Sequence, residues 1–237
     1  MKILIITTSH AQLGATGRKT GIWLEELAIP YYLFKDAGAE ITLASPIGGP
    51  VPVDPRSESI IASTSTIRRF QKDPEIASWM AHSISLETLK AADFDMVYLP
   101  GGHGAIWDFP DNQSLRALLE DFYRQNKIIG LISYGVSALV SMKTGDGEPF
   151  VKGKDITAAS DSEEQLAGLI GGTPFSLEAR LISFKAYFSK AANYICHTVV
   201  NGPIVTGQNS ASSTDVARRM LSLMKESLLI KANPQHY

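Results

Sequence analysis

The residues best suited to chemistry lie where an apolar strand runs into a turn of small residues. The run Ile128–Ile132 is followed at once by Ser133, Tyr134 and Gly135. A side chain at such a strand-to-helix corner is pushed out at the carboxyl edge of a parallel sheet, where ligands of open α/β folds bind. The pattern makes Ser133 a candidate nucleophile or substrate-contacting residue. The alternative is that Ser133 only caps the following helix.

A glycine loop follows another predicted strand. The segment 99–112, LPGGHGAIWDFPDN, places Gly101, Gly102 and His103 directly after an apolar run. Consecutive glycines allow backbone N–H groups to point into the same sheet edge, where they can stabilise a developing oxyanion. The spacing does not match a dinucleotide-binding fingerprint. On its own the loop is also compatible with a simple tight turn.

Two pairs of adjacent carboxylates supply candidate acid or base groups. They are Glu25 with Glu26, and Glu163 with Glu164. At helical spacing Glu26 has apolar neighbours, Trp23 among them, and burial there would raise the pKa of its carboxyl. The commoner arrangement for adjacent glutamates is a solvated helix face.

The histidines and the one cysteine predict no metal site. None of the five histidines has metal-ligand spacing with Cys, Asp or Glu, so no structural zinc is expected. Cys196 and His197 are adjacent near a predicted strand start. Neighbours on a strand point to opposite faces, so they are not expected to form a nucleophile–base pair.

Composition indicates a globular cytoplasmic protein. The net charge of −2 shows no basic excess for nucleic acid, and a single cysteine excludes an internal disulfide framework. Met1–Thr8 is interpreted as a strand rather than a signal peptide, and no apolar run approaches the ~20 residues of a membrane span. No repeat or linker divides the chain, so one domain over residues 1–237 is expected.

Short apolar runs alternate with helical patterns, which predicts an α/β fold with a mostly parallel central sheet covered by helices. The predicted strands are Ile3–Thr7, Ile41–Ala44, Met96–Leu99, Ile128–Ile132 and Ile204–Thr206. Helical spacing is found from Leu115 to Phe122, and this helix is predicted to start at Pro110 or Asp111. It is also found from Val216 to Leu223, where the predicted start is Ser213 or Thr214.

Three segments are less regular. Thr20–Phe34 is predicted as a helix, although Pro30 inside it removes a hydrogen bond and crowds the carbonyl of Glu26, so a kink is expected. Pro46–Ser57 is rich in Gly and Pro and is predicted as a loop. Ile60–Phe94 is long for a simple crossover and is interpreted as a helical excursion, whose position relative to Ser133 the sequence does not determine.

Taken together, these features resemble the DJ-1/PfpI superfamily, in particular its larger glyoxalase-III-like and chaperone-like branch. The matching segments occur in family order: TGIWLEELAIP (20–30), ITLASPIGGPVPVDPRS (41–57), LPGGHGAIWDFPDN (99–112), IIGLISYGVSAL (128–139), GKDITAASDSEEQLAG (153–168), TPFSLEARL (173–181) and VTGQNSASS (205–213). The resemblance implies a flavodoxin-like three-layer sandwich of the class I glutamine amidotransferase-like type, without a cofactor and often homodimeric.

The resemblance also implies residue roles. Family members carry a reactive cysteine at the elbow, followed by histidine, beside a protonated glutamate that corresponds to Glu26. Glu164 occupies the position of the acidic residue that orients the histidine. Backbone groups around Gly101, Gly102 and Tyr134 would supply oxyanion donors. The family's activities include cofactor-free glyoxalase, deglycase and peptidase reactions and chaperone behaviour.

This sequence departs from the family at the elbow, which is Ser133-Tyr134 rather than Cys-His. Serine is a poor nucleophile without a base, and tyrosine is a weak base at neutral pH. The family's cysteine-dependent glyoxalase chemistry therefore does not carry over to the chain as it stands. The serine is either natural or a replacement of a native cysteine.

Two functions remain open. The first is an enzyme, lyase-like or hydrolase-like, that acts on a small carbonyl or acyl substrate at the elbow. Its site would comprise the catalytic residues Ser133, Glu26, Tyr134 and Glu164, and the oxyanion or substrate-binding residues Gly101, Gly102 and His103. The alternative is a non-catalytic ligand-binding or chaperone-like protein. A glutamine amidotransferase would need a Cys-His-Glu triad, which this sequence lacks.

Overall fold

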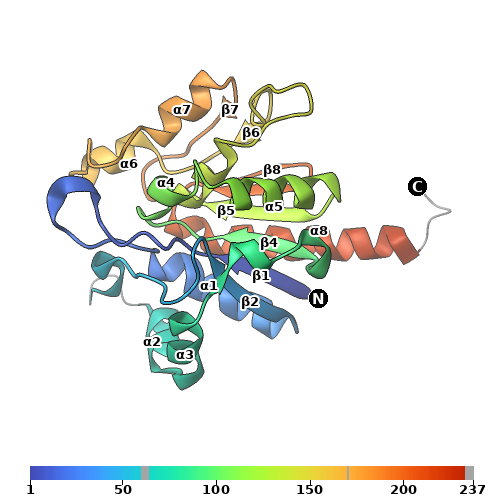
Figure 1. Ribbon diagram of the computed structural model, residues 1–237, viewed down its shortest axis with the longest axis horizontal. Coiled ribbons are helices and arrows are strands. Elements are labelled where there is room, and N and C mark those ends of the chain that lie inside the picture. The colour runs from blue at the N-terminus through green and yellow to red at the C-terminus, as the bar shows by residue number, and fades with distance from the viewer. Residues whose placement is uncertain (60–63, 170, 233–237) are drawn as a thin grey trace.

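The computed structural model describes residues 1–59, 64–169 and 171–232. A seven-stranded sheet forms its centre, in the order β3-β2-β1-β4-β5-β9-β8, and all neighbouring strands are parallel except β8 and β9 (Figure 1). The strands are β1 (Lys2–Ile6), β2 (Glu40–Ser45), β3 (Ile84–Ser85), β4 (Met96–Leu99), β5 (Ile128–Ile132), β8 (Thr198–Asn201) and β9 (Ile204–Gly207), and a separate short pair joins β6 (Asp155–Ile156) to β7 (Tyr187–Phe188). The α/β fold with a mostly parallel sheet is confirmed, as are the five predicted strands.

Helices cover both faces of this sheet and make two apolar cores. One core includes apolar side chains of α5, and the other those of α1 and α8. The helices are α1 (Leu24–Asp36), α2 (Ser65–Lys72), α3 (Pro74–Ala81), α4 (Ala105–Asp108), α5 (Gln113–Arg124), α6 (Asp161–Leu166), α7 (Leu177–Ser183) and α8 (Ser213–Ala232). None of the helices in the described ranges is both long enough and apolar enough to cross a membrane.

Two helix starts differ from the sequence prediction, and one agrees with it. α5 does not begin at Pro110 or Asp111, because the Asn112 side chain accepts the N–H of Leu115 at 2.8 Å and makes Asn112 the N-cap. α8 begins at Ser213, as predicted.

α1 begins at Leu24 rather than at Thr20. Ahead of it, the Ile22 N–H donates to the carbonyl of Pro52, and the Ile22 carbonyl accepts from the Asp54 N–H, each at 2.9 Å. These ladder-like bonds to the Gly/Pro-rich loop keep the residues before Leu24 extended. The loop was predicted without regular structure, but it ends in a short 3₁₀ helix, Pro55–Glu58, which the Asp54 side chain caps.

Pro30 inside α1 leaves one carbonyl without its helical partner. Proline has no N–H, so the carbonyl of Glu26, four residues earlier, receives no helical hydrogen bond from it. The hydroxyl of Tyr98, fully buried on β4, donates to this carbonyl at 2.6 Å. The helix is thereby attached to the sheet at Glu26.

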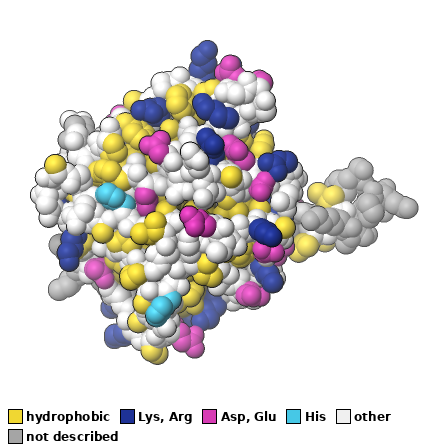
Figure 2. Space-filling view, in the orientation of Figure 1, with side chains coloured by type: hydrophobic (Ala, Val, Ile, Leu, Met, Phe, Trp, Pro, Cys, Tyr) yellow, Lys and Arg dark blue, Asp and Glu magenta, His cyan; other side chains and the backbone are white. Residues whose placement is uncertain are grey.

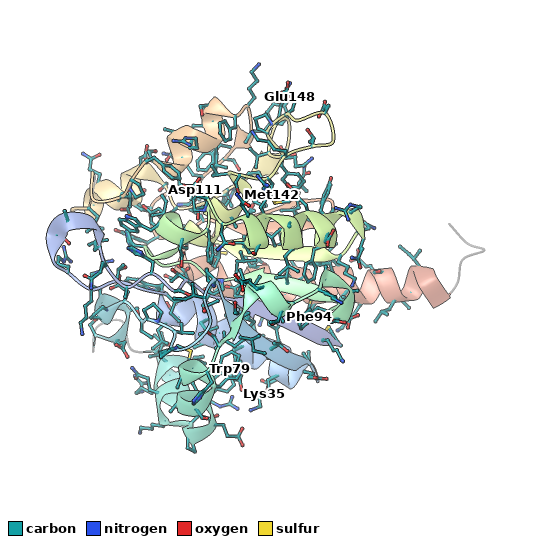
Figure 3. The ribbon with its side chains drawn as sticks, viewed as in Figure 1. Lys35, Trp79, Phe94, Asp111, Met142 and Glu148 are labelled. Carbon is teal, nitrogen blue, oxygen red and sulfur yellow. The ribbon has the colours of Figure 1, made fainter. Side chains whose placement is uncertain are left out.

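The segment Ile60–Phe94 forms the predicted helical excursion, of which residues 60–63 lie outside the described part. It contains α2 and α3 and returns as the edge strand β3. Trp79 of α3 packs on Tyr31 of α1 with ring centroids 5.0 Å apart (Figure 3). None of residues 64–94 lines the cavity at Ser133, so the described excursion covers α1 and leaves the sheet edge open.

Replacing Tyr98 with phenylalanine tests the attachment of α1 to the sheet. We expect Tyr98→Phe to lower the free energy of unfolding by about 1–3 kcal/mol, because the buried Glu26 carbonyl loses its partner. Urea denaturation of the purified variant measures the change. Tyr123→Phe is the matched control, since no hydrogen bond of the half-exposed Tyr123 hydroxyl is found in the described residues. Equal stability of the two variants would contradict the role assigned to Tyr98.

Candidate active site

Ser133 lies at a strained corner immediately after β5. Its φ is 53°, in the left-handed region that non-glycine residues rarely adopt, at a cost of about 1–3 kcal/mol. The 3₁₀ helix Ser133–Leu139 starts here. A Cβ atom at Gly135 would lie 2.4 Å from the carbonyl oxygen of Leu99 on β4, so only glycine permits this close approach of the turn to the sheet. Ser133 therefore occupies a nucleophile-elbow geometry at the carboxyl edge.

Glu26 is a buried carboxyl beside Ser133. Its side chain is almost inaccessible to solvent, and burial raises its pKa from 4.5 to about 8. The Gly101 N–H donates to Oε2 at 2.9 Å. This bond and the nearby Ser133 side chain lower the pKa, but less than burial raises it. At neutral pH Glu26 is thus predominantly a neutral carboxylic acid next to the serine hydroxyl.

Gly101 and Gly102 of the glycine loop differ in whether their backbone N–H groups are free to bind a ligand. The Gly101 N–H is already used by Glu26, so it is not free to bind an oxyanion as the sequence had suggested. Gly102 lines the cavity, and no hydrogen bond of its N–H is found in the described residues. Its φ is +103°, and a Cβ there would lie 2.3 Å from the Gly21 carbonyl oxygen. Gly102 is therefore the loop amide still available to a ligand.

Glu164 is paired with His103 of the glycine loop. The Nε2 atom of His103 lies 3.0 and 3.1 Å from the two carboxylate oxygens. Nδ1 of the same ring lies 3.0 Å from Nη2 of Arg56. A guanidinium only donates, so Nδ1 accepts and the ring proton must be on Nε2, donated to Glu164. Both nitrogens of His103 are thus engaged.

The chain of contacts continues in both directions from His103. The Arg56 side chain donates to both oxygens of the buried Asp54, at 2.9 and 2.5 Å. On the other side Tyr134 is hydrogen-bonded to Glu164, and its ring lies 4.7 Å from that of His103. Burial, together with the charge of Glu164, holds the pKa of Tyr134 far above its usual value, so its hydroxyl remains a donor.

A cavity of about 190 Å³ opens over these groups. The predicted residues that line it are Glu26, Gly102, His103, Ser133, Tyr134 and Glu164. Gly101 is not a lining residue, but its N–H donates to the lining residue Glu26. The sequence did not indicate several further lining residues, both apolar and polar: Trp23, Arg56, Ala159, Ala167, Leu169, Tyr194, Asn209 and Ser210. Several of these belong to the quoted motifs, but no pattern within the motifs distinguished them.

Glu163, also in the cavity wall, has a supporting role. Its Oε1 accepts from the Tyr194 N–H, Gln208 Nε2 and Asn209 Nδ2 at 2.7 to 3.0 Å, and its Oε2 accepts from Ser160. Four donors saturate this carboxylate, which connects the loop at Tyr194 to the strand end at Gln208. No group of three or more His, Cys, Asp or Glu side chains able to hold a metal occurs among the described residues.

Comparison with known proteins identifies the family. The model of the DJ-1/PfpI family matches residues 20–223. The chain belongs to the DJ-1/PfpI family. Glyoxalase 3 of Candida albicans is 27% identical over 94% of this chain and 98% of its own, and a glutathione-independent glyoxalase of Schizosaccharomyces pombe is 27% identical over 94% and 95%.

Solved structures agree with this DJ-1/PfpI assignment. The Rapid Encystment Protein of 24 kDa from Francisella tularensis has a TM-score of 0.90 and 34% identity, covering 94% of this chain and 98% of that one. Glyoxalase III of Candida albicans has a TM-score of 0.85 and 23% identity, covering 94% and 96%. At 23% sequence identity, the likeness to glyoxalase III shows the shared fold.

Substitution of Glu26 tests the neutral acid through pH-dependent stability. Because the pKa is about 8 in the folded state and about 4.5 unfolded, the folded protein binds the extra proton between these values. Its free energy of unfolding therefore falls as pH rises through that window. Glu26→Gln removes this penalty, and we expect it to be the more stable form by about 4 kcal/mol at pH 8, with no gain below pH 4.5.

Urea denaturation at several pH values measures this difference between Glu26→Gln and the unsubstituted protein. Glu87→Gln, on an exposed side chain, controls for the loss of one carboxyl. A gain for Glu26→Gln that does not change with pH would contradict the assignment.

Proposed function

We propose that this DJ-1/PfpI protein is an enzyme that binds a small carbonyl or acyl compound over Ser133 and activates its carbonyl with the neutral carboxyl of Glu26. The observation that carries the proposal is the buried carboxyl of Glu26, which lines the same cavity as Ser133 and has a pKa of about 8. A carboxyl group with such a pKa can donate a proton near neutral pH and take it back, as general acid–base catalysis requires.

The surrounding groups suit a polarised carbonyl oxygen. The Gly102 N–H is available as a hydrogen-bond donor at the cavity. Donors fixed before the substrate arrives stabilise negative charge that develops on the oxygen. The wall of Trp23, Leu169 and Tyr194 would cover the substrate's apolar part.

The names of the relatives narrow the substrate class. Several are glutathione-independent glyoxalases, so we propose a 2-oxoaldehyde as the first candidate substrate. Methylglyoxal and water would give lactate by such a reaction. A serine hydroxyl does not ionise as a thiol does, so turnover through Ser133 is expected to be slower than through a cysteine.

A second candidate, a non-catalytic ligand-binding protein, is favoured by one observation. Both ring nitrogens of His103 are engaged, by Glu164 and Arg56, and Tyr134 is hydrogen-bonded to Glu164. His103 is therefore not free to remove the proton of Ser133, so the cavity would bind a carbonyl compound without converting it.

Lactate formation from methylglyoxal, without glutathione, tests the proposal on four proteins. They are the unsubstituted chain, Ser133→Cys, Ser133→Ala and Glu26→Gln. We expect slow turnover by the unsubstituted chain and at least about tenfold more by Ser133→Cys, because a thiol is activated by its thiolate form. Both Ser133→Ala and Glu26→Gln should lose activity. The matched control is Glu25→Gln, which alters the adjacent helix carboxyl outside the cavity lining.

The outcomes separate the two functions. Equal rates for the unsubstituted chain, Ser133→Ala and Glu26→Gln would refute the enzyme proposal. The ligand-binding alternative would be favoured by two results together: only Ser133→Cys is active, and calorimetry shows that the unsubstituted chain binds methylglyoxal.

Partners and compartment remain proposals as well. We propose a homodimer in the cytoplasm that binds no nucleic acid. Figure 2 supports the last point, because basic and acidic side chains alternate on the face shown without a continuous basic surface. Light scattering tests the dimer, and a monomer would refute it.

A further inference from the structure

A second cavity, of about 300 Å³, lies between α1, α2 and α8. It shares no lining residue with the cavity at Ser133. Its lining residues are Ile29, Tyr32, Leu33, Asp36, Thr66, Arg69, Thr214 and Arg218. Neither the family assignment nor the proposed reaction uses any of these residues.

Tyr32 is the buried polar group of this cavity. Its side chain is 5% exposed, and its hydroxyl has no hydrogen-bond partner among the described residues. A buried hydroxyl without a partner costs about 1–3 kcal/mol, and such groups are rare in folded proteins. Burial also raises the pKa of Tyr32, so the hydroxyl stays protonated and can donate to a ligand.

Two arginines border the same cavity without an acidic partner in the described residues. The guanidinium of Arg69 is stacked 3.8 Å above the centre of the Tyr32 ring, which holds it in place. Arg218, on α8, makes no ion pair or hydrogen bond within the described ranges, whereas the next residue, Arg219, pairs with Asp215 at 3.6 Å. Unpaired guanidinium groups at one cavity are suited to an anion.

Two further donors and one opposing charge complete the lining. The hydroxyls of Thr66 and Thr214 make no hydrogen bond within the described part of the chain. Asp36 is the one carboxylate of the lining and is exposed, so the formal charge is positive by one. Ile29 and Leu33 provide an apolar wall on α1.

We propose that this cavity binds a phosphate group, either free or as the ester of a small apolar molecule. Guanidinium groups donate in a planar fork that matches phosphate oxygens, and hydroxyls add neutral donors. The bound phosphate would give the Tyr32 hydroxyl its missing partner. Ile29 and Leu33 would contact an ester substituent.

Calorimetric titration with inorganic phosphate and with phenyl phosphate at low ionic strength tests the proposal. We expect binding with a Kd of about 1 mM or tighter, equivalent to about 4 kcal/mol. Arg218→Gln and Arg69→Gln should each weaken it by about tenfold or more, since a charge-assisted hydrogen bond contributes about 1.5–3 kcal/mol. Arg219→Gln, which removes the same charge one residue away, should change it by less than about twofold.

Tyr32→Phe separates binding from folding. Because the hydroxyl has no partner in the part of the chain that the structure describes, this variant should be at least as stable as the unsubstituted chain and yet bind phosphate more weakly. Tighter binding of phenyl phosphate would indicate an ester ligand and equal binding a free anion, and both support the proposal. Absence of binding to both probes at about 10 mM, or an equal loss in Arg219→Gln and Arg218→Gln, would overturn it.

Discussion

The site depends on the burial of one carboxyl group, that of Glu26, at the carboxyl edge of the sheet. Burial would be costly for a charged side chain, and the structure offsets it by leaving the group protonated and hydrogen-bonded. Its backbone is fixed as well, because Pro30 frees the Glu26 carbonyl and Tyr98 of β4 takes it. A helix, a glycine loop and a strand are thereby joined at the residue that contacts Ser133.

A second feature of the site is that other titratable side chains near Ser133 already interact with one another. Asp54, Arg56, His103, Glu164 and Tyr134 form one chain of hydrogen bonds alongside the cavity. Such a chain orients its members but leaves none of them free to act as a base toward the serine. In the proposed reaction the chemistry falls to Glu26, whose proton is available at the elbow. This distinguishes the site from one built on a cysteine and an imidazole.

The sequence predicted the strands and the elbow, because each is a local pattern: an apolar run, or a strand followed by small residues. The helix pattern left Glu26 open between burial and a solvated face, and only the family resemblance implied a protonated carboxyl there. The sequence did not predict the partner of Glu164. His103 lies 61 residues from Glu164 and 47 from Arg56, so only the folded chain brings them together. Pro30 was correctly seen to disturb the Glu26 carbonyl, but the compensating Tyr98 is 72 residues away. The start of α1 was placed too early because the ladder to Pro52 leaves no local signature.

The central claim is that the carboxyl of Glu26 is neutral at physiological pH, and ¹³C NMR tests it most directly. The carboxyl carbon of Glu26, labelled with ¹³C and assigned by comparison with Glu26→Gln, would be followed from acid to alkaline pH. The account predicts that its resonance titrates near pH 8. A transition near the ordinary glutamate value of about 4.3 would show an ionised Glu26 and contradict the account.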